Sequence, residues 1–221
     1  MILTSNVPEA LAFEERSFPF PLRVVHNALP KGFAANHNAA FALAGGEFFC
    51  VVNPDIRLSV DPFPALMAEL EDRSVGVAAP LVHNETGSLE DSARSFPTPW
   101  EIFLKALGRG PGSDVEAGRD SSPDWVGGMF MLFRSSTFAE IGGFDPAYRL
   151  YYEDVDLCAR LRLKGYDVRL APKAIVTHLA RRSSHRNPRY AVWHLRSMLR
   201  FFASHSAREA RSLRRSNAAN R

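Results

Sequence analysis

Long hydrophobic runs are missing from this 221-residue sequence: it contains no stretch of about 18 uninterrupted apolar residues, the length that a membrane-spanning helix requires. Cysteine is scarce as well. Cys50 and Cys158 are the two in the chain, and their separation is not that of a metal site. We therefore expect two buried free thiols in a reducing cytosol and no disulfide framework.

Acidic residues are almost absent from the C-terminal part of the chain. Residues 181–221 contain eleven arginines and one glutamate, a net charge of +10, whereas residues 1–180 carry a net charge of −7. A mildly acidic body with a strongly basic tail predicts an anionic partner for the tail, which could be a membrane surface, nucleic acid or an acidic protein.

Short β-rich apolar runs and helical patterns follow one another along the body, which is long enough for one α/β domain. Strands are expected at residues 1–4, 22–26, 48–52, 75–79, 129–133, 168–170 and 174–177. Helices are expected up to residue 44, at 61–70, after residue 152, and from 187 to about 215. Residues 83–123, rich in Pro, Gly and Ser, predict a long loop that is functional or mobile.

The stretch 141–165 places an aromatic pair and three carboxylates at the start of an expected helix: Tyr151, Tyr152, Glu153, Asp154 and Asp156. Acidic residues in a first turn complement the helix dipole, which sufficiently explains Asp156. Two adjacent carboxylates at a loop-to-helix junction, Glu153 and Asp154, are also suited to general-base chemistry, in which one accepts a proton and the other tunes or orients it.

The order Gly-Gly-Phe-Asp, then Tyr-Tyr-Glu-Asp-Val-Asp-Leu-Cys-x-Arg and a later Gly, resembles the acceptor-site signature of family-2 inverting glycosyltransferases, most of all the rhamnosyltransferase-like branch. The resemblance covers roughly residues 22–185. It implies a Rossmann-like GT-A domain, which we place at residues 1–185, ahead of a basic helix and disordered tail at 186–221. It also implies that Asp154, assisted by Glu153, deprotonates the acceptor during inverting sugar transfer.

The implied substrates are a nucleotide-sugar donor and a carbohydrate or lipid-linked acceptor of cell-surface polysaccharide synthesis. Deoxythymidine-diphosphate (dTDP) rhamnose is the first expectation for the donor, ahead of UDP-hexose and UDP-galactofuranose. The alternative is a catalytically degenerate module that binds a nucleotide sugar or a membrane surface.

Asn53-Pro54-Asp55 follows the strand expected at residues 48–52, at the carboxyl end where open α/β sheets bind ligands. Such a tripeptide is also a common turn, but in this place it resembles the family's variant of an Asp-x-Asp metal motif. The resemblance makes Asp55 a ligand of Mg²⁺ or Mn²⁺, an ion that would neutralise the leaving diphosphate. His178 follows a strand in the region from which related enzymes supply a second ligand, although a lone histidine is equally consistent with a structural role.

Further donor contacts are expected from Asn38, Asn53 and Arg94. Asn38 ends a segment that is similar to the family's Gly-Phe-Gly…Asn segment near the nucleotide. Arg94 lies in the long loop, where it could meet phosphate or be solvated.

Acceptor or sugar contacts are expected from Trp125, Gly127, Gly128 and Tyr152. The family places a segment like Trp-Val-Gly-Gly beside the sugar. From the residues alone, paired glycines indicate either a close backbone approach to a ligand or a bulge.

The basic C-terminal helix is amphipathic, with one expected apolar stripe formed by Ala191, Leu195, Met198 and Phe202. A basic helix that also carries Trp193 predicts docking on an anionic membrane surface, and so a cytoplasmic protein at the inner face of the membrane. Binding of nucleic acid, which would show a steep salt dependence, is not expected because no known nucleic-acid module accompanies the helix.

Family-2 enzymes resemble one another in a first strand that contacts the nucleobase and a helix that leads to the second strand. Residues 2–4 look like that second strand. We therefore expect the natural reading frame to extend upstream of Met1, or the chain to bind its donor weakly.

Overall fold

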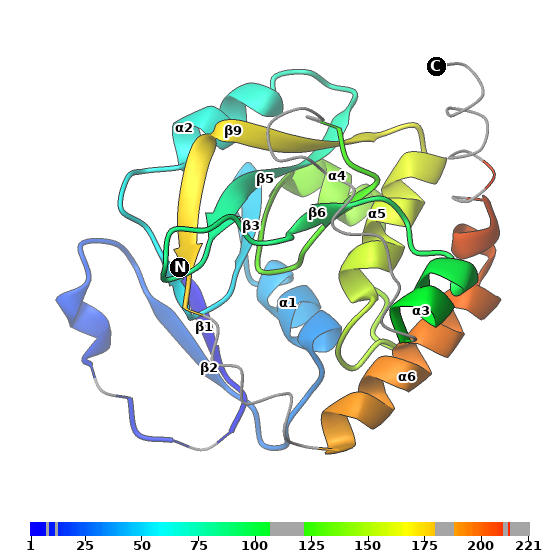
Figure 1. Cartoon of the computed structure of the whole chain (residues 1–221). Coiled ribbons are helices and arrows are strands. Elements are labelled where there is room, and N and C mark those ends of the chain that lie inside the picture. The colour runs from blue at the N-terminus through cyan, green and yellow to red at the C-terminus, as the bar shows by residue number, and fades with distance from the viewer. Residues whose placement is uncertain (8, 12, 107–121, 180–187, 210–211, 213–221) are drawn as a thin grey trace.

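A computed structural model describes residues 1–7, 9–11, 13–106, 122–179, 188–209 and 212 of the chain. Its body is a five-stranded sheet with helices on both faces (Figure 1). In spatial order the strands are β3 (Phe48–Val52), β8 (Phe130–Arg134), β5 (Val75–His83), β9 (Asp167–His178) and β4 (Ile56–Arg57). β5 and β9 pair in parallel and the other pairs are antiparallel. The expected α/β fold is confirmed.

The middle of the sheet follows from a nearly continuous apolar run. β5 reads Val-Gly-Val-Ala-Ala-Pro-Leu-Val-His and is buried along most of its length. Its register with β9 shifts between Pro80 and Leu81, because proline has no backbone N–H to donate to the ladder. The two short strands expected at residues 168–170 and 174–177 are one strand, β9, that passes through this irregularity.

Two hydrophobic cores lie on opposite faces of the sheet. Along β8, Met131 and Phe133 belong to one core while Phe130 and Leu132 belong to the other, as the alternation of side chains along a strand requires. One core is covered by α2 (Phe63–Glu69). The larger one receives residues from α1 (Phe33–Phe41), α4 (Ser135–Glu140), α5 (Glu153–Leu163) and α6 (Pro188–Ala203).

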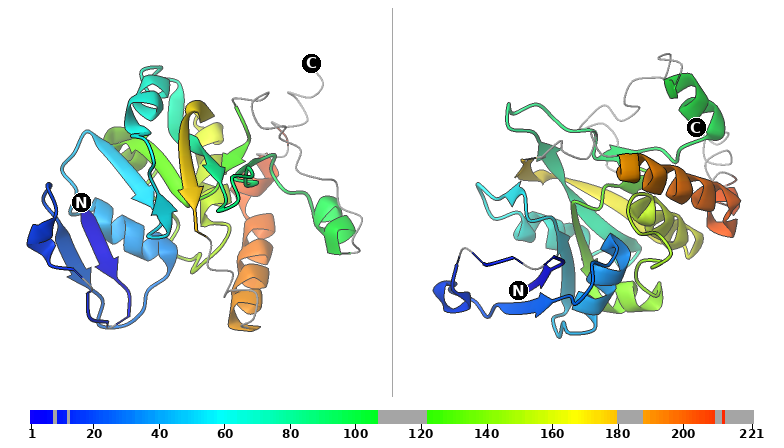
Figure 2. Two further views of the ribbon diagram at one scale, coloured as in Figure 1. Left: turned by 60° about the vertical axis from the view of Figure 1, so that its left-hand side comes forward. Right: turned by 90° about the horizontal axis from the view of Figure 1, so that it is seen from below.

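Three smaller units surround the central sheet. β1 (Ile2–Ser5) and β2 (Arg23–His26) form a separate parallel pair to one side of it (Figure 2), and the segment between them contains the short helix η1 (Glu15–Ser17). The stretch 83–123, expected to be a loop, is partly regular: it holds β6 (Ala93–Arg94), which pairs with β7 (Trp125–Val126), and α3 (Pro99–Ala106). Residues 107–121 of that stretch lie outside the described residues.

The C-terminal helix α6 packs on the body with part of its expected apolar stripe, of which Ala191 and Leu195 are exposed. Phe201 and Ser197 are buried on the inner face, whereas Leu195, expected in the apolar stripe, is 51% exposed. Met198 and Phe202 pack against the larger core, as amphipathicity predicts. The domain boundary that we placed at residue 185 lies outside the described residues.

Two further observations concern expectations about thiols and membranes. Both cysteines are free, but only Cys158 is buried and Cys50 is partly exposed, which corrects the expectation of two buried thiols. In the part of the chain that the structure describes, no helix has the length and apolar character needed to cross a bilayer.

Candidate active site

The loop that leads into α5 has an unusual backbone. Tyr151 and Tyr152 both adopt left-handed conformations, with φ of 68° and 65°. A left-handed conformation costs a residue other than glycine about 1–2 kcal/mol, so the surrounding structure must hold this pair in place. Nothing in the sequence indicates it, because bulky aromatic residues rarely occupy this region.

Glu153, the first residue of α5, carries a buried carboxyl group. Its side chain is 5% exposed, and among the described residues its Oε2 atom has no hydrogen-bond partner. Burial raises the pKa of Glu153 to about 8, and the neighbouring Asp154 adds to the rise. A carboxyl group in this position favours its protonated form near neutral pH.

Asp154, beside it, is partly buried, and backbone N–H groups donate hydrogen bonds to its carboxylate. The N–H groups of Gly128 and Val155 donate hydrogen bonds to its Oδ2 and Oδ1 atoms, at 2.9 and 2.8 Å. Burial raises the pKa of Asp154, while these two N–H groups and the charge of Arg94 oppose the rise. These bonds stabilise the anionic form of Asp154, and among the described residues none reaches the buried Oε2 atom of Glu153, so the geometry favours the charge on Asp154 and the proton on Glu153.

Several of the expected sugar-binding residues gather around Asp154. Gly128 lies so close that a Cβ atom there would meet the Phe33 ring at 3.2 Å and the Asp154 Cβ atom at 3.6 Å. Glycine at this position therefore permits the close approach of the turn after β7 to the Phe33 ring of α1, whereas the contact with Asp154 would be an ordinary one. The Tyr152 ring is buried, and burial followed by the Asp154 charge raises its pKa to about 12.

Trp125 and Arg94 are paired across the two short strands β7 and β6. The Arg94 guanidinium lies over the Trp125 ring, 5.6 Å from its centroid, and pairs with Asp91 at 2.8 Å. The Trp125 indole N–H donates to the Ser95 carbonyl at 3.0 Å. Arg94 was expected at the donor phosphates, and the structure places its charge where it also acts on Asp154 and Tyr152.

A second group of polar side chains lies where β4 pairs with β9. Ile56 is paired with His178 in the sheet, which brings Asp55 beside the histidine: Asp55 Oδ1 lies 3.3 Å from His178 Nε2. On the other side of the ring, Glu90 Oε2 lies 3.0 Å from Nδ1. The two expected metal ligands are thus brought together from positions more than a hundred residues apart.

The donor atoms of this group fit a divalent cation. Asp55 Oδ1 is buried, and its contact with His178 lacks hydrogen-bond geometry, so it remains without a hydrogen-bond partner among the described residues. In the same part of the chain, no cluster of three or more His, Cys, Asp or Glu side chains forms a complete metal site. Asp55 and His178 therefore offer two ligands, and a cation bound there would complete its shell with donor phosphates and water.

Glu90 was not anticipated from the sequence. It is brought beside His178 by a hairpin in which Asn84 accepts hydrogen bonds from the backbone of Thr86 and Ser88, and the Glu90 N–H donates to the Val82 carbonyl at 2.7 Å. The turn residues around Asn84 could have indicated the hairpin, but they do not indicate that its Glu90 lies beside His178.

The backbone of Gly128 and Met129 links the Glu153–Asp154 pair to the group formed by Asp55, His178 and Glu90. The N–H of Gly128 donates to Asp154, and the carbonyl of Met129 accepts from the N–H of Asn53 at 2.9 Å. Asn53 in turn accepts from the N–H of Ile56 at 3.2 Å, which closes the turn that presents Asp55. The two groups therefore flank a single short stretch of backbone.

Asn38 has a structural task in this structure. Its amide donates to the Phe144 carbonyl at 2.7 Å and accepts from the Phe144 N–H at 3.0 Å. The side chain thus holds the loop before α5, and a contact with the donor would require it to exchange these partners. The contacts of Asn38, Asn53 and the other expected site residues with substrate remain predictions.

Comparison with known proteins places these features in a family. A family model described as "Glycosyl transferase family group 2" matches residues 51–206. The rhamnosyltransferase WbbL of Escherichia coli K12 is 31% identical over 185 residues, which cover 78% of this chain and 70% of the relative. N-acetylglucosaminyl-diphospho-decaprenol L-rhamnosyltransferase of Mycobacterium tuberculosis H37Rv is 32% identical over 153 residues, which cover 64% of this chain and 50% of that relative.

Two solved structures share the fold at low sequence identity. GalNAc-T7 with UDP, GalNAc and Mn²⁺ has a TM-score of 0.60 and 15% identity, covering 81% of this chain and 37% of that one. The mannosyltransferase PcManGT from Pyrobaculum calidifontis, in complex with GDP-Man and Mn²⁺, has a TM-score of 0.53 and 18% identity, covering 81% and 47%. Both are GT-A enzymes, which confirms the expected GT-A fold. This chain spans less than half the length of either structure.

Proposed function

Because this chain belongs to glycosyl transferase family group 2, we propose that it transfers a sugar from a nucleotide donor to a carbohydrate or lipid-linked acceptor, with inversion at the anomeric carbon. The observation that carries the proposal is the Glu153–Asp154 pair. It places two carboxyl groups with raised pKa values side by side, with backbone N–H groups donating to Asp154, at the junction that the family signature marks.

Asp154 acts as the general base in this proposal. Its raised pKa makes it a better proton acceptor near neutral pH, and the Gly128 and Val155 N–H groups fix its orientation. As the acceptor oxygen attacks the anomeric carbon, its proton passes to Asp154 and the bond from that carbon to the diphosphate oxygen breaks. Glu153 keeps its proton and limits the negative charge of the pair, and the ordered loop supplies orientation.

The donor half of the site would hold a divalent cation through Asp55 and His178. Both structural neighbours were solved with Mn²⁺, and either Mg²⁺ or Mn²⁺ suits a site of one carboxylate, one imidazole and substrate phosphates. A cation there would neutralise charge on the leaving diphosphate. Arg94, with its guanidinium held over Trp125, would contribute positive charge from the chain itself.

Rhamnose carried by dTDP is the proposed donor, and an N-acetylglucosaminyl-diphospho-lipid is the proposed acceptor. The names of both relatives support rhamnose as the sugar, and the name of the Mycobacterium tuberculosis enzyme supports the acceptor. A lipid-linked acceptor lies at a bilayer surface, so the outer face of α6 is relevant: Val192, Leu195 and Leu199 are exposed there, and Arg189 and Arg196 are exposed beside them. We propose that this face docks on an anionic bilayer.

The enzymatic proposal is tested by incubating the protein with dTDP-rhamnose, Mn²⁺ and a synthetic N-acetylglucosaminyl-diphospho-prenol. Mass spectrometry should show addition of one deoxyhexose, and NMR should show an inverted anomeric configuration. Binding of the donor without transfer to this or any other acceptor would favour the degenerate binding module instead.

The docking proposal is tested with vesicles of phosphatidylglycerol and of phosphatidylcholine. Binding should occur to the former, weaken as salt is added, and fall when Leu195 and Leu199 are both changed to serine. Equal binding to both kinds of vesicle, or to neither, would overturn it.

A further inference from the structure

Helix α6 makes polar contacts with the loop that leads into α5. Ser197 is 5% exposed, and its hydroxyl donates to the Leu150 carbonyl at 2.9 Å. One turn further along α6, the Arg200 guanidinium donates to Asp145 Oδ2 at 2.9 Å. Both partners precede the left-handed tyrosine pair in the chain, so α6 fixes the approach to that pair at two points.

Aromatic contacts from the same helix reach the tyrosines themselves. The His194 ring lies 5.2 Å from the Tyr151 ring and 5.4 Å from the Tyr152 ring, centroid to centroid. The Phe201 ring lies 5.6 Å from that of Tyr152. The tyrosine pair therefore packs on the inner face of α6, which supplies the surroundings that a strained backbone requires.

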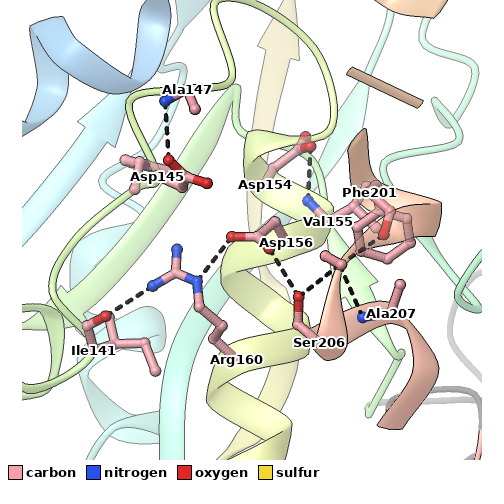
Figure 3. A network of polar contacts seen from close by, with 12 residues as sticks. Ile141, Asp145, Ala147, Asp154, Val155, Asp156, Arg160, Phe201, Ser206 and Ala207 are labelled. Atoms are coloured by element: carbon pink, nitrogen blue, oxygen red, sulfur yellow. Dashed lines mark hydrogen bonds and ion pairs between the residues drawn. The ribbon is translucent and has the colours of Figure 1, made fainter. Parts of the chain in front are cut away.

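The chain that follows α6 holds the first turn of α5. The Ser206 hydroxyl donates to Asp156 Oδ1 at 3.0 Å, while Arg160 donates to the other oxygen of Asp156 at 2.8 Å and to the Ile141 carbonyl at 2.7 Å (Figure 3). Asp156 is buried, so this junction fixes the turn of helix that carries Glu153 and Asp154.

These contacts lead to one inference. We propose that α6 braces the catalytic loop, and that Ser197 and Arg200 are positioning residues that set the place of Asp154. Neither residue belongs to the signature at 141–165, and neither touches the carboxylate pair in the contacts described above. They act through the backbone of Leu150 and through Asp145, upstream of the tyrosine pair. The catalytic part of this inference rests on the proposed function, whereas the structural part does not.

The Gly128 amide gives a direct measure of where Asp154 lies, because its N–H donates to Asp154 Oδ2. In Ser197→Ala and Arg200→Ala, hydrogen exchange at Gly128 should become at least about tenfold faster. Exchange at Leu132, paired on both sides within the sheet, should stay unchanged. Alanine is a better helix former than serine, so loss of α6 itself is not expected from Ser197→Ala.

Turnover provides the second readout. With dTDP-rhamnose and Mn²⁺, both variants should show a kcat reduced about tenfold to a hundredfold, since a small displacement of a reacting group has effects of that size. The KM for the donor should stay unchanged, because the hydrogen bonds of Ser197 and Arg200 described above go to the loop before α5 and not to Asp55 or His178.

Ser135→Ala is the matched control. The Ser135 hydroxyl also donates to a backbone carbonyl, that of Gly46 at 2.6 Å, but at the far end of β8. Its loss should leave both Gly128 exchange and kcat at the wild-type values.

The two proposals fail separately. If hydrogen exchange at Gly128 stays at the wild-type rate in both Ser197→Ala and Arg200→Ala, the proposed role of α6 is wrong, whether or not the protein transfers a sugar. Faster exchange at Gly128 in a protein whose wild type transfers no sugar supports the brace and overturns the proposed function. A fall of kcat in Ser135→Ala equal to that in Ser197→Ala also overturns the brace, because the effect would then follow from loss of any such bond.

Discussion

The two halves of the candidate site arrange their carboxylates in opposite ways. Glu153 and Asp154 are neighbours in sequence; burial raises the pKa of both carboxyl groups, and the charge of Asp154 raises that of Glu153 further. Asp55 and Glu90 are far apart in sequence and lie on either side of His178, each within 3.3 Å of a ring nitrogen. The first half brings two carboxyl groups together, whereas the second places two carboxylates on either side of one imidazole ring.

This difference corresponds to two kinds of chemistry. Proton transfer needs a carboxylate that is basic enough to accept a proton at neutral pH, and burial beside a second carboxyl group produces one. Holding a cation needs ligands that are deprotonated and fixed in orientation, and a carboxylate behind a histidine fixes the ring. The two halves should therefore respond differently to the same kind of substitution.

Asp154→Asn should produce the largest effect. Loss of a general base typically lowers the rate about 10²–10⁴-fold, so kcat for transfer from dTDP-rhamnose should fall by at least about a hundredfold. Mn²⁺ affinity, measured by electron paramagnetic resonance of the free ion, should stay at the wild-type value because Asp154 belongs to the other half. If the variant keeps more than about a tenth of the rate, less than ~1.4 kcal/mol of the barrier was lost and Asp154 is not the base.

Asp55→Ala should lower the affinity for Mn²⁺, which Asp154→Asn should leave unchanged. Removal of one of two protein ligands should weaken Mn²⁺ binding by about a hundredfold or more, and transfer should fall to the level of wild-type protein in a chelator. In the wild type, Mg²⁺ or Mn²⁺ added after the chelator should restore transfer. Full activity of the wild type in excess chelator would show that the donor half binds no essential cation.

Glu90→Gln should give an intermediate effect that is confined to the donor half. Residues that orient a metal-binding histidine typically contribute about 10–100-fold to metal affinity, and glutamine retains an oxygen that can accept from the Nδ1 side of the ring. We expect Mn²⁺ affinity to fall about tenfold in Glu90→Gln and further in Glu90→Ala. Nitrogen-15 NMR of His178 should show a change in tautomer population. An unchanged tautomer together with unchanged affinity would leave Glu90 with no role toward the ion.

The same comparison explains what the sequence could and could not predict. The acceptor half lies within one stretch, so its carboxylates and helix were found from local pattern and family signature. The donor half depends on the pairing of β4 with β9 and on a hairpin, and for this reason Glu90 was missed although Asp55 and His178 were anticipated. Such partners are set by tertiary contacts that local pattern does not encode.

The brace from α6 was missed for a related reason. The sequence places Leu195 in one apolar stripe with Met198 and Phe202, yet Leu195 is exposed while those two pack on the core, and Ser197 faces inward to reach a backbone carbonyl. A serine at a buried helix position carries no hydrophobic signal. The left-handed tyrosines likewise contradict the backbone preference of their residue type, and only packing against α6 accounts for them.

Glu153→Gln should produce the smallest effect on catalysis and a distinctive effect on stability. Because burial raises the pKa of Glu153 from 4.5 to about 8, the folded protein binds more protons than the unfolded chain between these two values. Stability from this group is complete below about pH 4.5 and is lost as the pH rises through about 8.

Glutamine cannot ionise, so Glu153→Gln should melt like the wild type near pH 4.5 and at a higher temperature than the wild type at pH 8. In a chain of this length, each kcal/mol of stability that ionisation of Glu153 costs the wild type should add about 2–4 °C to the difference in melting temperature. Differential scanning calorimetry across this range measures the divergence. Parallel melting curves for Glu153→Gln and the wild type at every pH would mean that Glu153 is ionised in the folded protein, and the contrast between the two halves would disappear.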